Sequence, residues 1–62
     1  MRTITYTILD WTDEPEIAGF TIMETETWHA TTGDEVHRHD IPGWYATRAE
    51  AQTAVETLFA TL

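Results

Sequence analysis

The sequence predicts an α+β domain in which a three-stranded antiparallel sheet is covered on one face by a single C-terminal helix. Residues 3–8 alternate strictly between threonine and larger apolar or aromatic side chains, as half-buried strands do. Residues 47–62 carry an apolar stripe at helical spacing. The chain has 62 residues, which is the length of one small domain. We therefore expect residues 1–62 to form a single β-β-β-α unit.

The first strand is defined by Ile4, Tyr6 and Ile8, which share one face because side chains alternate along a strand. The segment 12–16 is polar and contains Pro15, so it predicts a loop. A second strand is expected from about Ile17 to Trp28.

The second half of the sheet is less regular in sequence. Residues 30–34 predict a turn, and a third strand is expected from Glu35 to about Ile41. Pro42 and Gly43 then predict a break. Residues 44–46 would form either a short fourth strand or an extended segment leading into the helix.

The second strand poses a problem of register. Glu24 and Glu26 have the same parity as Phe20 and Ile22, which are expected in the core. Either the strand extends beyond the area that the helix covers, or a bulge switches its faces. The first alternative would leave an acidic two-stranded ribbon projecting from the core.

The helix is predicted to begin at Thr47 or Arg48. Thr47 and Glu50 have the spacing of a capping box, in which each side chain bonds the other residue's backbone N–H. We expect Leu58 and Phe59 to be buried against the apolar face of the first strand. The apolar stripe comprises Ala51, Val55, Leu58, Phe59 and Leu62.

The charge balance is the main indication of function. Eleven Asp and Glu residues stand against three Arg and no Lys, which gives a net charge of −8. Such a surface is repelled by nucleic acid and anionic lipid and is attracted to basic surfaces, including those that bind nucleic acid. The alternative is that the acidity only keeps the domain soluble or reflects a salt-adapted or GC-rich genome.

The acids cluster in ways that could imitate a row of phosphates, since a carboxylate accepts paired bonds from Arg much as a phosphate does. Glu24 and Glu26 would point the same way about 6.8 Å apart. The alternative is that charges on strands prevent aggregation between sheets. A Trp beside carboxylates is typical of an interface anchor. The predicted partner-binding residues are Asp10, Asp13, Glu14, Glu16, Glu24, Glu26, Trp28, Asp34 and Glu35.

Metal binding and catalysis are not expected. His37 and His39 share a face and His29 lies across the turn, so with Asp34 or Asp40 they could hold Zn²⁺. Solvated histidines beside carboxylates are the interpretation we prefer, and no cofactor is expected. The chain has no Cys and no Ser to serve as a nucleophile, and its three glycines are isolated.

The segment Trp44–Ala51 resembles the strand-to-helix junction of small modules with three strands and a helix. The arm-type DNA-binding domains of phage integrases share this order of elements, but their sheet is basic, so DNA binding is not implied here. In size, charge and lack of catalytic motifs the chain is more similar to small phage-encoded acidic inhibitors, which include DNA mimics and anti-CRISPR proteins.

That resemblance implies a non-catalytic inhibitor that occupies the basic surface of a nucleic-acid-binding complex, such as a CRISPR-Cas effector. It would bind no nucleic acid or membrane itself. We expect a monomer in the cytoplasm, and specifically the host cytoplasm if the protein is phage-encoded. The alternative is a small regulatory or antitoxin-like interaction domain whose acidity serves solubility.

Overall fold

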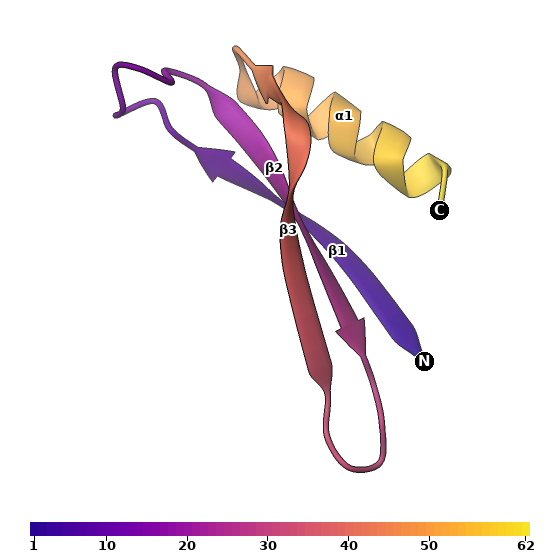
Figure 1. The fold of residues 1–62 in the computed structure, drawn as a ribbon. Coiled ribbons are helices and arrows are strands. Elements are labelled where there is room, and N and C mark those ends of the chain that lie inside the picture. The colour runs from indigo at the N-terminus through magenta and orange to yellow at the C-terminus, as the bar shows by residue number, and fades with distance from the viewer.

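The computed structural model describes all 62 residues and has the predicted α+β architecture. Strands β1 (Arg2–Asp10), β2 (Phe20–Trp28) and β3 (Glu35–Tyr45) form one antiparallel sheet in the order β1-β2-β3. Helix α1 (Arg48–Ala60) crosses one face of this sheet, and the far ends of the strands project beyond it (Figure 1). The molecule is therefore elongated, with extents of 44 × 24 × 14 Å.

The strand register settles which residues face the helix. Tyr6 lies opposite Glu24, and Glu24 lies opposite His39. The alternation along β2 is not interrupted between Ile22 and Glu26, so both glutamates are on the same face as the core residues. The first alternative from the sequence is thus correct: the sheet outruns the helix, and no bulge switches the faces at the glutamates.

The core is small and is centred on β2. Ile22 and Ala51 have no exposed surface, while Val55 and Phe20 are 6% and 8% exposed. The expectation that Phe59 is buried is wrong, because Phe59 is 48% exposed. Ala51 and Val55 belong to the buried face of α1, one turn apart.

Phe59 is instead placed over the edge of the sheet. Its ring meets the ring of Tyr6 edge-on, with centroids 4.9 Å apart. Tyr6 is on β1, an edge strand, so no further strand covers the outer side of this pair. Leu58 and Ile4 and Ile8 of β1 are only half-buried.

The second strand begins at Phe20, three residues later than predicted. The backbone N–H groups of Ile17 and Ala18 both donate to the Glu14 carbonyl, at 3.1 and 2.7 Å, so these residues belong to a turn. Ala18 has φ of 47°, which is incompatible with a strand. The indole of Trp44 closes the turn, since its Nε1 donates to the Ile17 carbonyl at 2.8 Å.

The third strand continues through Pro42 and Gly43 to Tyr45, so the predicted break and the separate fourth strand are both wrong. Phe20 pairs with Tyr45 and Ile22 with Ile41, which places extra residues on the β3 side of a bulge. Proline is tolerated because β3 is an edge strand, where its missing N–H need not serve the ladder. Gly43 has φ of 137°, a conformation that favours glycine.

The predicted helix start is confirmed. Thr47 is the N-cap, and its Oγ1 accepts a hydrogen bond from the Glu50 N–H at 3.2 Å. The reciprocal bond of a capping box, from the Thr47 N–H to the Glu50 side chain, is not formed. α1 has neither the length nor the apolar character that a membrane crossing needs.

Candidate functional site

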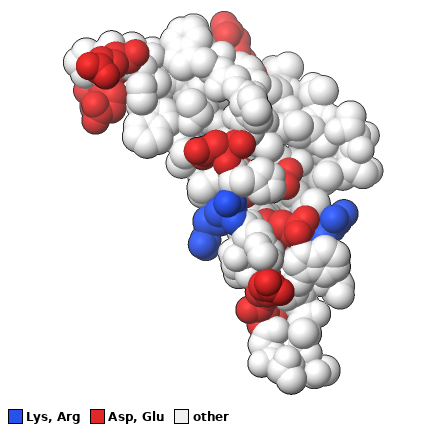
Figure 2. Space-filling model, viewed as in Figure 1, with Lys and Arg blue, Asp and Glu red and all other residues white.

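The predicted partner-binding residues are spread along the molecule and do not form one patch. We define a loop cluster (Asp10, Asp13, Glu14 and Glu16), a strand pair (Glu24 and Glu26) and a hairpin pair (Asp34 and Glu35). The loop cluster lies at the end of the sheet near Trp44, and the hairpin pair lies at the opposite end. In Figure 2, acidic side chains accordingly appear near both ends of the molecule and along its middle.

The loop cluster is held in a defined conformation. The Trp11 N–H donates to the Gly19 carbonyl at 2.8 Å and closes the loop at its base. Asp10 accepts bonds from the Thr12 N–H at 2.9 Å and from the Thr12 hydroxyl at 2.6 Å. These two bonds, with Arg48 at 3.7 Å, lower the pKa of the Asp10 carboxyl. The other acids of the cluster are exposed and take part in no ion pair: Asp13, Glu14 and Glu16.

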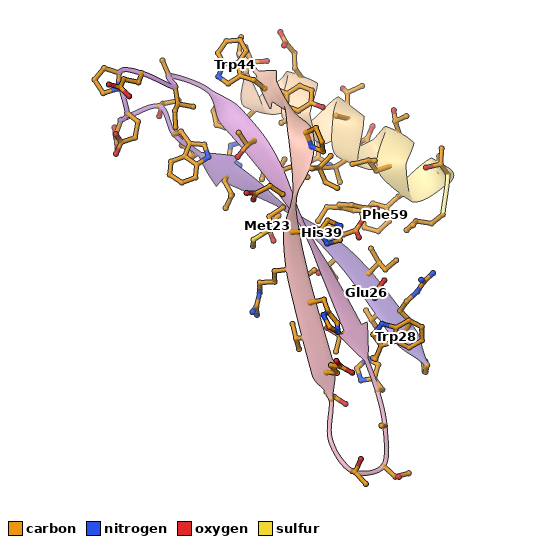
Figure 3. The ribbon with its side chains drawn as sticks, viewed as in Figure 1. Met23, Glu26, Trp28, His39, Trp44 and Phe59 are labelled. Atoms are coloured by element: carbon orange, nitrogen blue, oxygen red, sulfur yellow. The ribbon has the colours of Figure 1, made fainter.

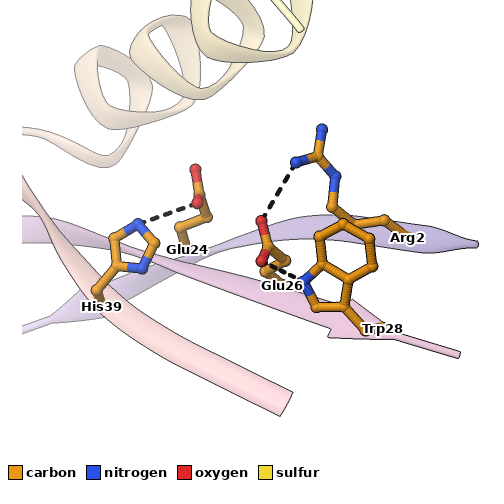
Figure 4. A network of polar contacts seen from close by, with 5 residues as sticks. All are labelled: Arg2, Glu24, Glu26, Trp28 and His39. Carbon is orange, nitrogen blue, oxygen red and sulfur yellow. Dashed lines mark hydrogen bonds and ion pairs between the residues drawn. The ribbon is translucent and has the colours of Figure 1, made fainter. Parts of the chain in front are cut away.

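The strand pair is engaged within the protein. The Glu24 carboxylate lies 3.0 Å from His39 Nε2, and its side chain is only 16% exposed (Figure 4). It also accepts a hydrogen bond from the Tyr6 hydroxyl. Partial burial, this bond and the glutamate charge together raise the pKa of Tyr6.

Glu26 is likewise occupied. One carboxylate oxygen lies 3.5 Å from an Arg2 guanidinium nitrogen, and the other accepts a bond from Trp28 Nε1 (Figure 4). The Arg2 guanidinium also lies over the Trp28 ring, 5.5 Å from its centroid. Trp28 remains 44% exposed, as an anchor residue would be, but the two glutamates do not form a free row of charges.

The hairpin pair is exposed, and both of its members are next to histidines. Asp34 lies 3.3 Å from His29 Nδ1, and Glu35 lies 3.0 Å from His37 Nε2. With His39 beside Glu24, each histidine thus has one carboxylate of its own, as the preferred interpretation of the sequence held. No three His, Asp or Glu side chains converge as a set of metal ligands.

The face of the sheet opposite the helix is uncovered. Thr3 lies opposite Thr27 and Thr5 opposite Thr25, and Met23 continues the same face. Met23 and Phe59 point to opposite sides of the sheet (Figure 3). Trp11 adds to this face, since its Nε1 donates to Thr21 Oγ1 at 2.8 Å.

Three exposed acids were missed as candidates. Asp40, Glu50 and Glu56 take part in no ion pair, and their carboxylates are as free as those of the loop cluster. The sequence could have indicated them only through the polar face of the helix and the parity of β3. Arg38 is the one arginine with no carboxylate within ion-pair distance.

Comparison with protein-family models, with curated proteins and with solved structures finds no match for this chain.

Proposed function

We propose that this protein is an acidic, non-catalytic binding protein that occupies a basic, nucleic-acid-binding surface of a partner. It would act as phage-encoded inhibitors of host defence complexes do, with CRISPR-Cas effectors as the class of target. The observation that carries the proposal is a net charge of −8 distributed along a body 44 Å long. A compact acidic domain would present its charge over a shorter distance.

The charge density can be compared with that of DNA. Dividing 44 Å by 8 net charges gives one charge per 5.5 Å of length. Duplex DNA carries one charge per about 1.7 Å, and each of its strands one per about 3.4 Å. The protein is therefore nearer to a single phosphate backbone than to a duplex, and we expect it to cover a groove that contacts one strand.

The loop cluster supplies the carboxylates that are best suited to the partner's cations. Asp13, Glu14 and Glu16 need not give up an internal ion pair before they bind. The strand pair would first have to leave His39 and Arg2. We accordingly propose that the loop cluster makes the primary contact and that the strand pair orders the ribbon.

The same internal pairs favour the second candidate, a regulatory or antitoxin-like interaction domain whose acidity serves solubility. Five of the eight predicted acidic site residues have a cationic or histidine neighbour within the protein: Asp10, Glu24, Glu26, Asp34 and Glu35. In this case the partner would be recognised through apolar surface, and removing free acids would leave binding unchanged.

A competition experiment separates the two. A labelled DNA duplex is bound to a purified CRISPR-Cas effector, and its displacement by this protein is followed by fluorescence anisotropy. We expect mutually exclusive binding that weakens steeply with added salt, because exposed charge pairs are screened within about 8–10 Å. A panel of other basic nucleic-acid-binding proteins extends the test if the first effector is not the target.

Matched charge variants locate the contact. Asp13→Asn, Glu14→Gln and Glu16→Gln together remove three charges, and Asp40→Asn, Glu50→Gln and Glu56→Gln remove three elsewhere. We expect the first triple variant to weaken competition about tenfold, from three exposed pairs of modest strength, and the second to have little effect. Simultaneous, indifferent binding of protein and DNA by every partner captured would refute the mimicry.

A further inference from the structure

The outer edge of β1 is open, and its backbone pattern can be read from the ends of the strand. The Met1 carbonyl accepts from the His29 N–H, and the Trp11 N–H donates to the Gly19 carbonyl, both at 2.8 Å. β1 and β2 pair without interruption between these bonds. In an antiparallel ladder, alternate residues direct both backbone groups to the same neighbour. The odd-numbered residues therefore bond β2, and the backbone groups of the even-numbered residues from Arg2 to Asp10 point away from the sheet.

The two edges of the sheet differ in how they are protected against pairing. The β3 edge contains Pro42, a bulge, and charged residues such as Arg38 and Asp40. These are the features by which natural sheets block further strands. β1 has no proline and no charged residue between Arg2 and Asp10, and its threonines, isoleucines and tyrosine favour strand structure.

The sequence of β1 is complementary to itself in the antiparallel direction. If two copies pair about Tyr6, Arg2 of each copy lies opposite Asp10 of the other, and Ile4 lies opposite Ile8. All these residues are even-numbered, so each pair falls where the backbone groups point outward. Arg2 and Asp10 side chains are 48% and 49% exposed, and both can accept a further partner.

We propose that the protein forms a twofold-symmetric dimer in which the β1 strands of two copies pair antiparallel about Tyr6 and create one six-stranded sheet. Both helices then lie on the same face of this sheet. The expectation of a monomer, which rested on sequence alone, is replaced by this assignment. The dimer does not depend on the proposed function.

A second observation supports the same seam. Phe59 is 48% exposed and packs on Tyr6, the centre of the proposed pairing, and Leu62 just beyond it is 64% exposed. The C-terminal end of α1 lies on the β1 side of the sheet (Figure 1). The twofold axis brings the Tyr6–Phe59 pairs of the two copies together, so that each covers apolar surface of the other.

The shape of a single chain also indicates that a partner is missing. Its radius of gyration is 13.6 Å, against about 11 Å for a compact chain of this length. Its accessible surface is 4519 Å², against about 4,100 Å² for a compact monomer of this mass. An edge-to-edge dimer would remove surface from the side of the sheet where the helix leaves Tyr6 and Phe59 uncovered.

The first test is a charge exchange measured by sedimentation equilibrium from micromolar to millimolar protein. Arg2→Asp and Asp10→Arg each place like charges at both ends of the seam, and we expect each to weaken self-association about tenfold. Mixed together, the two variants have opposite charges at both ends and should associate as a heterodimer. Arg38→Asp and Asp40→Arg make the same changes in net charge on the other edge and should leave the seam intact.

Added salt should strengthen the dimer, because each copy carries a net charge of −8 and the two repel one another. Binding to a basic partner should weaken under the same change. The two proposals thus predict opposite responses to salt, and either can fail without the other.

Hydrogen exchange gives a readout that does not depend on any variant. At high concentration the amides of Ile4, Tyr6 and Ile8 should become protected, whereas those of Thr5 and Thr7 should be protected at every concentration. A chain that stays at 7.1 kDa up to millimolar concentration would overturn the proposal. So would a dimer in which the even-numbered amides of β1 still exchange freely.

Discussion

The position of the core predicts that Ile22 matters more to stability than the larger Phe59. Ile22 has no exposed surface, whereas Phe59 is 48% exposed. Truncating a buried Ile to Ala costs about 2–5 kcal/mol, and truncating a buried Phe about 3–5 kcal/mol. Scaling the Phe value by the surface that is buried leaves about 2 kcal/mol for Phe59→Ala, including the loss of its edge-on contact with Tyr6.

These losses are large for this domain. A chain of 62 residues is expected to have a free energy of unfolding of roughly 3–9 kcal/mol. Ile22→Ala therefore removes a large share of the stability, and Ile22→Val, at about 0.5–1.5 kcal/mol, provides a milder probe if the alanine variant is unfolded.

The assay is urea denaturation followed by tryptophan fluorescence, in dilute protein so that self-association does not add to the stability. We expect the order of destabilisation to be Ile22→Ala, then Phe59→Ala, with unchanged slopes. If Phe59→Ala destabilises the monomer more than Ile22→Ala, the core is centred on the β1 edge rather than on β2, and the packing described above is wrong.

Two further predictions concern the loop and the pH dependence. Gly19→Ala should destabilise the fold by about 1–3 kcal/mol, because the added methyl group would overlap the Trp44 indole; in a Trp44→Ala background the same change should cost much less, and equal costs in both backgrounds would exclude the clash. Tyr6 has a raised pKa in the folded protein, so the unfolded chain loses its proton first as pH rises above the ordinary value of 10.0. The stabilising contribution is complete below that value and is lost as pH rises through the folded-state pKa; Tyr6→Phe should flatten this alkaline fall, and an unchanged alkaline denaturation profile would contradict the assignment.

The sequence by itself determined the elements whose signals are local. The alternation of residues 3–8 depends only on the period of a strand, and Thr47 is a cap wherever a helix follows it. The fold class and the helix start could therefore be predicted. The charge of −8 is also a property of composition, and no folding step can change it.

The tertiary structure decided what those elements do to one another. Pro42 and Gly43 predict a break, but they lie on an edge strand where a bulge absorbs them, and edge position is not written in any local pattern. Ile17 looks like the start of a strand, yet the Trp44 indole, far along the chain, holds it in a turn.

The candidate site shows the same division. The sequence identifies the carboxylates, and only the fold separates the free ones at Asp13, Glu14 and Glu16 from those already held by His39 and Arg2. The open edge of β1 likewise became visible only with the strand order and the direction of its backbone groups. Ion pairing and edge exposure depend on which residues lie side by side in space, whereas periodicity and capping depend on neighbours in the chain.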